Sequence, residues 1–86
     1  MNSTFFMSEA EIKQLQGYWP SLSKQEALYF HLISIGFTRT DIAYGLGFSK
    51  NSIDKTIYRI AEKLETTTVH LRSIYLNRLL FIALNT

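Results

Sequence analysis

The chain has 86 residues, no cysteine and a formal net charge of +2, so it is short enough for one domain, and a disulfide scaffold or a thiolate metal site is excluded. Hydrophobic residues make up 47% of the chain and charged residues 19%, which predicts helices with much apolar surface to bury. No apolar run reaches the roughly 18–20 residues of a membrane span and no signal peptide is visible, so we expect a cytoplasmic protein with no membrane partner.

The first predicted element is a short helix that begins at residues 8–11, which read SEAE. A serine and a glutamate three residues apart form a capping box, in which each side chain bonds the backbone amide of the other residue. Gly17 is placed to end this helix, and Pro20 favours extended backbone just before it. We therefore interpret residues 1–21 as an N-terminal arm with one short helix, whose first six residues are frayed.

Three further helices are predicted from the same signals. The stretches SKQE at 23–26 and TRTD at 38–41 each begin a helix with a capping box, and Gly36 and Gly47 end these two helices. A serine cap begins a third, which covers residues 49–64. The helix-turn-helix core is therefore expected to span residues 22 to 66.

Residues 65–68, which read ETTT, break the helical pattern, and a last helix is predicted over 68–84. The expected fold class is all-α: a compact four-helix helix-turn-helix domain with a short extra N-terminal helix. Residues 67–86 would form a C-terminal dimerisation helix within the same domain.

Residues 42–57, which read IAYGLGFSKNSIDKTI, have the spacing of a helix-turn-helix. Ala43 is small where the next helix would cross it. Gly47 allows a left-handed backbone conformation in the turn, and Ile53 and Ile57 can pack back under the preceding helix. Such a pair of helices presents its second member to the major groove of DNA.

The helix over 49–64 has one apolar arc and one polar face when its residues are stepped by about 100°. The candidate DNA contacts on the polar face are Asn51, Ser52, Lys55, Tyr58, Arg59 and Lys63. Lys50 in the first turn, and Thr38 and Arg39 at the start of the preceding helix, are candidate phosphate contacts. Asp54 lies at the rim, where it can stabilise the helix dipole. The alternatives are that it accepts from a cytosine amino group or repels wrong sequences, or that it lowers the ordinary affinity for DNA. The alternative is that all of these residues belong to an ordinary solvent-exposed face that contacts no DNA.

The last helix carries more apolar residues than one stripe can hold. The arc of Val69, Leu76 and Leu80 is expected to pack on the core. A second arc would then need a second copy of the chain as cover, and the predicted dimer interface is Leu71, Ile74, Tyr75, Arg78 and Ile82. The alternative is that the N-terminal helix covers this arc within one chain.

From Leu22 to Leu64 the sequence resembles the LuxR/GerE-type helix-turn-helix domain of bacterial transcription regulators. The stretches that carry the resemblance are LSKQE at 22–26, GFTRTDIA at 36–43, LGFSKNSI at 46–53 and RIAEKL at 59–64. The resemblance implies a four-helix domain that binds double-stranded DNA as a dimer, reads the major groove with its third helix and pairs through its last. The family usually has lysine and histidine at the places of Asp54 and Thr56, and that lysine is commonly a DNA contact.

These features together predict a sequence-specific DNA-binding transcription regulator, a homodimer in the bacterial cytoplasm at the nucleoid. The alternative is an adaptor on the same fold that pairs with another regulator and binds DNA weakly or not at all. No nucleophile–base set, carboxylate pair or phosphate loop suggests an enzyme. His31 and His70 have no ligand-spaced partners, and no metal, cofactor or small-molecule ligand is expected.

Overall fold

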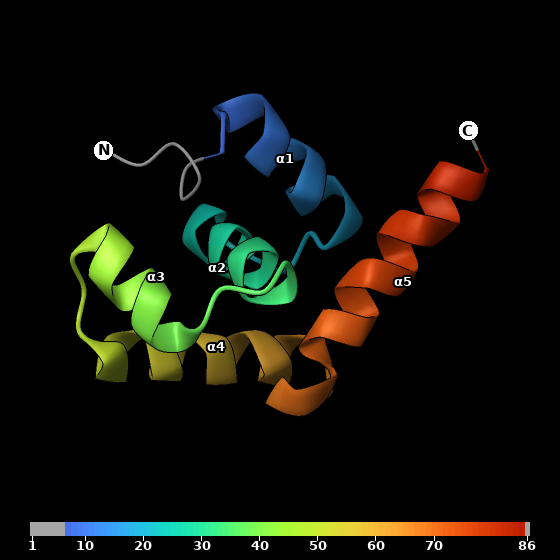
Figure 1. The fold of residues 1–86 in the computed structure, drawn as a ribbon. Coiled ribbons are helices and arrows are strands. Elements are labelled where there is room, and N and C mark those ends of the chain that lie inside the picture. Colours follow the sequence, from blue (N-terminus) through green and yellow to red (C-terminus); the bar gives the residue numbers. More distant parts are fainter. Residues whose placement is uncertain (1–6, 86) are drawn as a thin grey trace.

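A computed structural model describes residues 7–85 of the chain. These residues form helices and no strands, which confirms the predicted all-α class. The bounds of the helices are α1 Glu9–Tyr18, α2 Lys24–Ser34, α3 Arg39–Leu46, α4 Lys50–Lys63, the 3-10 helix η2 Thr68–His70 and α5 Leu71–Leu84 (Figure 1). The frayed arm predicted for residues 1–6 lies outside the described residues.

Local sequence signals place the starts of the helices. A complete capping box begins each of α1, α2 and α3, and the Ser49 hydroxyl caps α4. The predicted end of the first helix at Gly17 is wrong: α1 continues through it to Tyr18, and the Trp19 amide donates to the Leu15 carbonyl. Trp19 is buried in the core, so the packing of its ring holds the last turn of α1 together past the glycine.

The central helix of the fold is α2, and α1, α3, α4 and α5 all pack against it (Figure 1). One end of the core is aromatic. The ring of Trp19 stacks on that of Tyr75 with 5.4 Å between the centroids, and Phe30 meets both rings edge-on. Aromatic pairs in these geometries stabilise a core beyond the area that they bury. The cluster therefore ties α1, α2 and α5 to one another.

The turn between α3 and α4 has the predicted geometry. Gly47 adopts the left-handed conformation with a φ of 76°. The carbonyl of Ala43 accepts hydrogen bonds from the amides of both Gly47 and Phe48. Ile53 and Ile57 are fully buried, so α4 packs on α3 and α2 with its apolar side inward and leaves its polar side in solvent.

The break predicted at residues 65–68 separates α4 from α5. Glu65 has a φ of 55°, a positive value that no other non-glycine among the described residues shows. The short helix η2 follows, and the α-helix begins at Leu71. The predicted last helix is therefore a 3-10 turn followed by an α-helix that begins three residues later than predicted.

The two faces of α5 are the reverse of those predicted. Leu71 and Tyr75, predicted to contact a second copy, are each 1% exposed and lie in the core of their own chain, and Ile74 packs partly buried against that core. The ring of Trp19 and the imidazole of His31, which hydrogen-bonds the Tyr75 hydroxyl, cover this arc. The physical reason is that Tyr75 in this arc carries both an aromatic ring and a hydroxyl, and both find partners within the chain.

The arc predicted to pack on the core faces solvent instead. The predicted members were Val69, Leu76 and Leu80. We call Leu76, Leu80 and Leu84 the outer stripe of α5; Phe81, and Val69 from η2, are further exposed apolar residues beside it. Leu80 is 59% exposed and Leu84 is 75% exposed. Of the other predicted interface residues, Ile82 is half-buried and Arg78 is exposed. The last turns of α5 lie at the edge of the molecule (Figure 1).

Candidate nucleic-acid interface

The outer face of α4 lies along one edge of the molecule (Figure 1). At about 100° per residue, four side chains fall on one narrow strip that faces away from the buried isoleucines. We call Asn51, Lys55, Tyr58 and Glu62 the central strip. All four are exposed, and Tyr58 is 65% exposed. Ion pairs flank the strip on both sides.

Asp54 joins the beginning of α3 to the beginning of α4. Its Oδ1 accepts from Arg39 Nη1 at 3.2 Å, and its Oδ2 accepts from Lys50 Nζ at 3.2 Å. The hydrogen bonds from Lys50 and Arg39 lower the pKa of Asp54. We call these three residues the Asp54 triad. The sequence predicts that Asp54 lies near the start of the helix. The structure shows in addition that Asp54 bridges cations from two helices.

Glu26 lies on the other side of the central strip, and its side chain is 3% exposed. Its Oε2 accepts from Arg59 Nε at 2.8 Å, and its Oε1 accepts from Lys63 Nζ at 2.7 Å and from the Ser23 amide at 2.8 Å. Burial by itself would raise the pKa of Glu26, but the bonds from Lys63, Ser23 and Arg59 outweigh it and lower the pKa to about 2. Glu26, Arg59 and Lys63 form the Glu26 triad, which joins α2 to the later turns of α4.

The structure leaves most of the predicted DNA contacts exposed on one face and engages others in the fold. The exposed residues are Thr38, Lys50, Asn51, Ser52, Lys55, Tyr58, Arg59 and Lys63, whereas Arg39 and Asp54 are half-buried. Lys63 is engaged, because its ammonium bonds Glu26 and also the Ser21 carbonyl at 3.2 Å. Thr38 caps α3, and its amide donates to the Asp41 carboxylate. The chain's own side chains therefore occupy amides at this helix start that could otherwise bind a phosphate.

Lys55 differs from the other cations of this face. The other four belong to the Asp54 triad or the Glu26 triad. Within residues 7–85 Lys55 has no carboxylate partner, and it lies in the middle of the central strip. It is therefore the cation most available to a phosphate or a base.

Sequence reasoning missed the ion pairs of Glu26. The capping box of α2 already accounts for a glutamate at this place. Its partners Arg59 and Lys63 lie 33 and 37 residues further along the chain, and no spacing rule links positions so far apart. The pairing depends on how α4 packs against α2.

Comparisons of the chain with protein-family models, with curated proteins and with solved structures found no match. The resemblance to the LuxR/GerE-type domain therefore stays a prediction that rests on the sequence motifs. In the described part of the chain, no three side chains of His, Asp or Glu gather to hold a metal ion. Over the same residues, no helix is both long and apolar enough to cross a membrane.

Proposed function

We propose that the protein is a sequence-specific DNA-binding transcription regulator that presents α4 to the major groove. The observation that carries the proposal is the exposed central strip on a helix that follows a helix-turn-helix turn. Each flanking triad combines two cations with one carboxylate and so keeps a net charge of one positive unit. The major groove is about 12 Å wide and admits such a helix.

Asn51 and Lys55 are the side chains best suited to read bases. An asparagine amide can pair with adenine, and a lysine ammonium can bond guanine or a phosphate. Lys50 and Arg59 lie at opposite edges of the face, and each keeps N–H groups that its carboxylate does not use. These two residues would bond phosphates on the two sides of the groove and fix the position of the helix.

Asp54 occupies the place where the resembled family usually has a lysine. Its carboxylate already accepts from Arg39 and Lys50, which favours a role in holding these cations over a role in reading cytosine. The carboxylate also neutralises one positive charge beside the groove. It would thereby reduce the electrostatic, sequence-independent part of DNA binding.

A titration of labelled duplex fragments at two salt concentrations tests the proposal. We expect the affinity to fall at least about tenfold between roughly 50 and 200 mM salt. Lys55→Ala should weaken binding by about tenfold, because it removes an unpaired cation from the centre of the face. Lys13→Ala is the matched control, since Lys13 is an exposed cation on α1, and should change the affinity by less than about twofold. Equal losses for the two variants, or no salt-dependent binding to any fragment, would contradict the proposal.

The proposed regulator acts as a homodimer through the outer stripe of α5. Leu76, Leu80 and Leu84 repeat every four residues and form an exposed ridge with no charged residue in it. Exposed apolar patches of this kind mark interaction surfaces. A two-fold dimer pairs the same patch on both copies and would present two α4 helices to two half-sites on DNA.

Replacing Leu80 by Glu should convert the dimer to a monomer, because two buried carboxylates would face each other across the two-fold axis. Light scattering coupled to size-exclusion chromatography measures the mass directly. Tyr44→Glu places the same charge at an exposed position of α3 and should leave the dimer intact. A wild-type mass of one chain at the highest concentration tested would show that the dimer proposal is wrong.

The second candidate function is an adaptor that pairs with another regulator. The observation that favours it is that four of the five cations near the central strip are already paired with carboxylates of the same chain. An adaptor would bind no duplex fragment in the titration at either salt concentration, and its partner would dissociate in the Leu80→Glu variant. The regulator proposal, by contrast, puts the protein on the bacterial nucleoid in the cytoplasm.

A further inference from the structure

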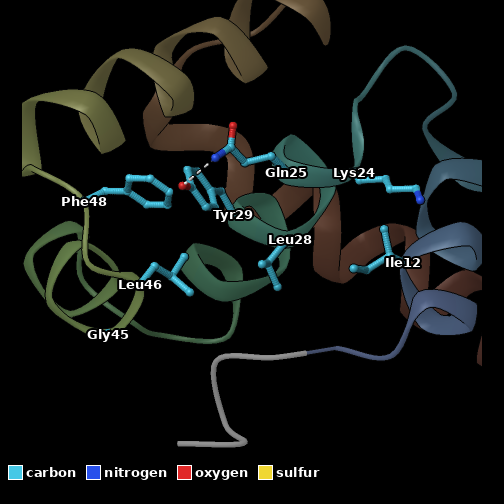
Figure 2. Close-up of a pocket in the computed structure, with 8 residues that line it drawn as sticks. All are labelled: Ile12, Lys24, Gln25, Leu28, Tyr29, Gly45, Leu46 and Phe48. Carbon is cyan, nitrogen blue, oxygen red and sulfur yellow. Dashed lines mark hydrogen bonds between the residues drawn. The ribbon is translucent and has the colours of Figure 1, made fainter. Parts of the chain in front are cut away.

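Glu26 is the residue of α2 whose side chain bonds α4 in the part of the chain that the structure describes. Gln25, the residue before it, bonds Tyr29 of its own helix at 3.1 Å, beside a mainly apolar pocket of about 400 Å³ (dashed line in Figure 2). The Glu26 carboxylate instead bonds Arg59 and Lys63 of α4 at 2.8 and 2.7 Å. Since Arg59 is a candidate phosphate contact, this carboxylate lies beneath the surface proposed to face DNA.

The position of the Glu26 carboxylate is fixed within the folded chain. Its side chain is 3% exposed, and its Oε1 accepts from the Ser23 amide and from Lys63 Nζ. The Glu26 amide donates in turn to the Ser23 hydroxyl at 3.1 Å, which completes the capping box of α2. A buried carboxylate held in this way is a rigid support for the cation that bonds its other oxygen, and that cation is Arg59.

The guanidinium of Arg59 is bound at one end and open at the other. Its Nε donates to Glu26 Oε2 at 2.8 Å, and its Nη2 donates to Thr56 Oγ1 at the longer distance of 3.5 Å. Both N–H groups of Nη1 and the second N–H of Nη2 have no partner within residues 7–85. The side chain is 53% exposed. Its open edge therefore has the two donors with which arginine bonds two oxygens of one phosphate.

We propose that Glu26 is a positioning residue for DNA recognition, an inference that rests on the proposed function. Glu26 holds Arg59 so that the open edge of the guanidinium bonds one phosphate when α4 lies in the correct register in the groove. Phosphate contacts fix the register of a protein on the duplex. A mobile arginine can bond phosphates in many registers and loses side-chain entropy each time. A positioned Arg59 thus favours the register in which the central strip meets its bases.

The inference predicts an effect of Glu26 on discrimination between DNA sequences. We define the discrimination ratio as the affinity for the best-bound genomic fragment divided by the affinity for a scrambled duplex of the same length. Glu26→Gln raises the net charge by one unit and frees Arg59 and Lys63, so the affinity for the scrambled duplex should not fall. The discrimination ratio should fall by about fivefold, because Arg59 must then be ordered when DNA binds.

The DNA titration with both duplexes measures this ratio. Partial unfolding of the variant would lower both affinities by the same factor and leave the ratio unchanged, so the ratio separates positioning from stability. Glu9→Gln is the matched control, because it removes the same charge from an exposed residue of α1, and its ratio should stay within about twofold of the wild-type value. Equal ratios for Glu26→Gln and Glu9→Gln would overturn the inference.

A change at Arg59 itself tests the same contact without removing Glu26. Arg59→Lys keeps the charge and loses the planar fork, so it should also lower the discrimination ratio by about fivefold. Arg72→Lys is its control, since Arg72 is exposed on α5, and should leave the ratio unchanged. An Arg59→Lys variant with the wild-type ratio would overturn the inference.

A double-mutant cycle shows whether Glu26 acts through Arg59. In the Arg59→Ala chain, the added Glu26→Gln change should alter the discrimination ratio by less than about twofold. A further fivefold loss in that background would show that Glu26 acts through Lys63 or through the packing of α4. That result would overturn the role assigned to the guanidinium.

Side-chain ¹⁵N relaxation of the DNA-free chain tests the positioning by itself. The Arg59 Nε–H should be more ordered than those of Arg72 and Arg78, which are exposed, and should lose this order in Glu26→Gln. Equal order in the two chains would overturn the inference. If Arg59 is ordered and no fragment binds the wild-type chain, the proposed function fails and the holding of Arg59 by Glu26 stands. If fragments bind and Glu26→Gln keeps the wild-type ratio, the inference fails and the proposed function stands.

Discussion

Replacing Glu26 by Gln is expected to lower the free energy of unfolding by about 3 kcal/mol at neutral pH. The pKa of Glu26 in the folded chain is about 2, below its ordinary value of 4.5. Because folding depresses this pKa, the stabilisation is fully present above about pH 4.5 and is lost as the pH falls from about 4.5 to about 2. Glutamine keeps the size of the side chain and removes the charge, so the variant should lack this part of the acid sensitivity.

Urea unfolding, followed from neutral pH down to about pH 2, measures both quantities. Glu62→Gln is the matched control, because Glu62 is exposed on the same face of α4 and has no ion-pair partner in the described part of the chain. Its stability should stay within about 0.5 kcal/mol of the wild-type value. A Glu26→Gln variant that is no less stable than this control would show that the Glu26 triad does not hold α4 to α2.

Replacing Tyr75 by Ala is expected to lower the free energy of unfolding by about 4 kcal/mol. Tyr75 is 1% exposed, and its ring stacks on Trp19 and meets Phe30 edge-on. The substitution would leave a cavity where α1, α2 and α5 meet. Tyr75→Phe, which keeps the ring and removes only the hydrogen bond to His31, should lose about 1 kcal/mol.

Tyr44→Ala is the control for this series, since Tyr44 is 92% exposed on α3 and its loss should change stability by no more than about 0.5 kcal/mol. Urea unfolding and light scattering on the same samples separate stability from assembly. The contrary outcome is that Tyr75→Ala has the wild-type free energy of unfolding but no longer forms a dimer. Tyr75 would then lie at the dimer interface that the sequence predicts. The assignment of the outer stripe to the dimer would then be wrong.

The starts of α1 to α4 and the central turn were predictable from the sequence because their causes are local. A capping box joins residues three positions apart. The turn needs a residue that tolerates a positive φ, and Gly47 is such a residue. The end of α1 was predicted wrongly from the same kind of signal. Gly17 favours a stop, but the ring of Trp19, two residues later, is buried against Phe30 and Tyr75.

The face of α4 was predictable for a different reason. Its apolar residues, such as Ile53 and Ile57, recur at the helical period, so one arc had to be buried and the opposite arc had to be polar. For α5 the same reasoning failed, because two arcs are apolar and the period does not say which one meets the core. Tyr75 decided it, through contacts with Trp19 and His31 that no periodicity reveals.

The sequence by itself determined the all-α class, the starts of α1, α2, α3 and α4, the turn at Gly47 and the residues that α4 exposes. The tertiary structure decided which arc of α5 is free and which cations are already paired. Glu26 shows the reason most directly. Its capping bonds reach the backbone of Ser23, three residues away, whereas its ion pairs reach Arg59 and Lys63, more than thirty residues away. Bonds within one helical turn follow from spacing, but bonds between helices depend on the packing that brings those helices together.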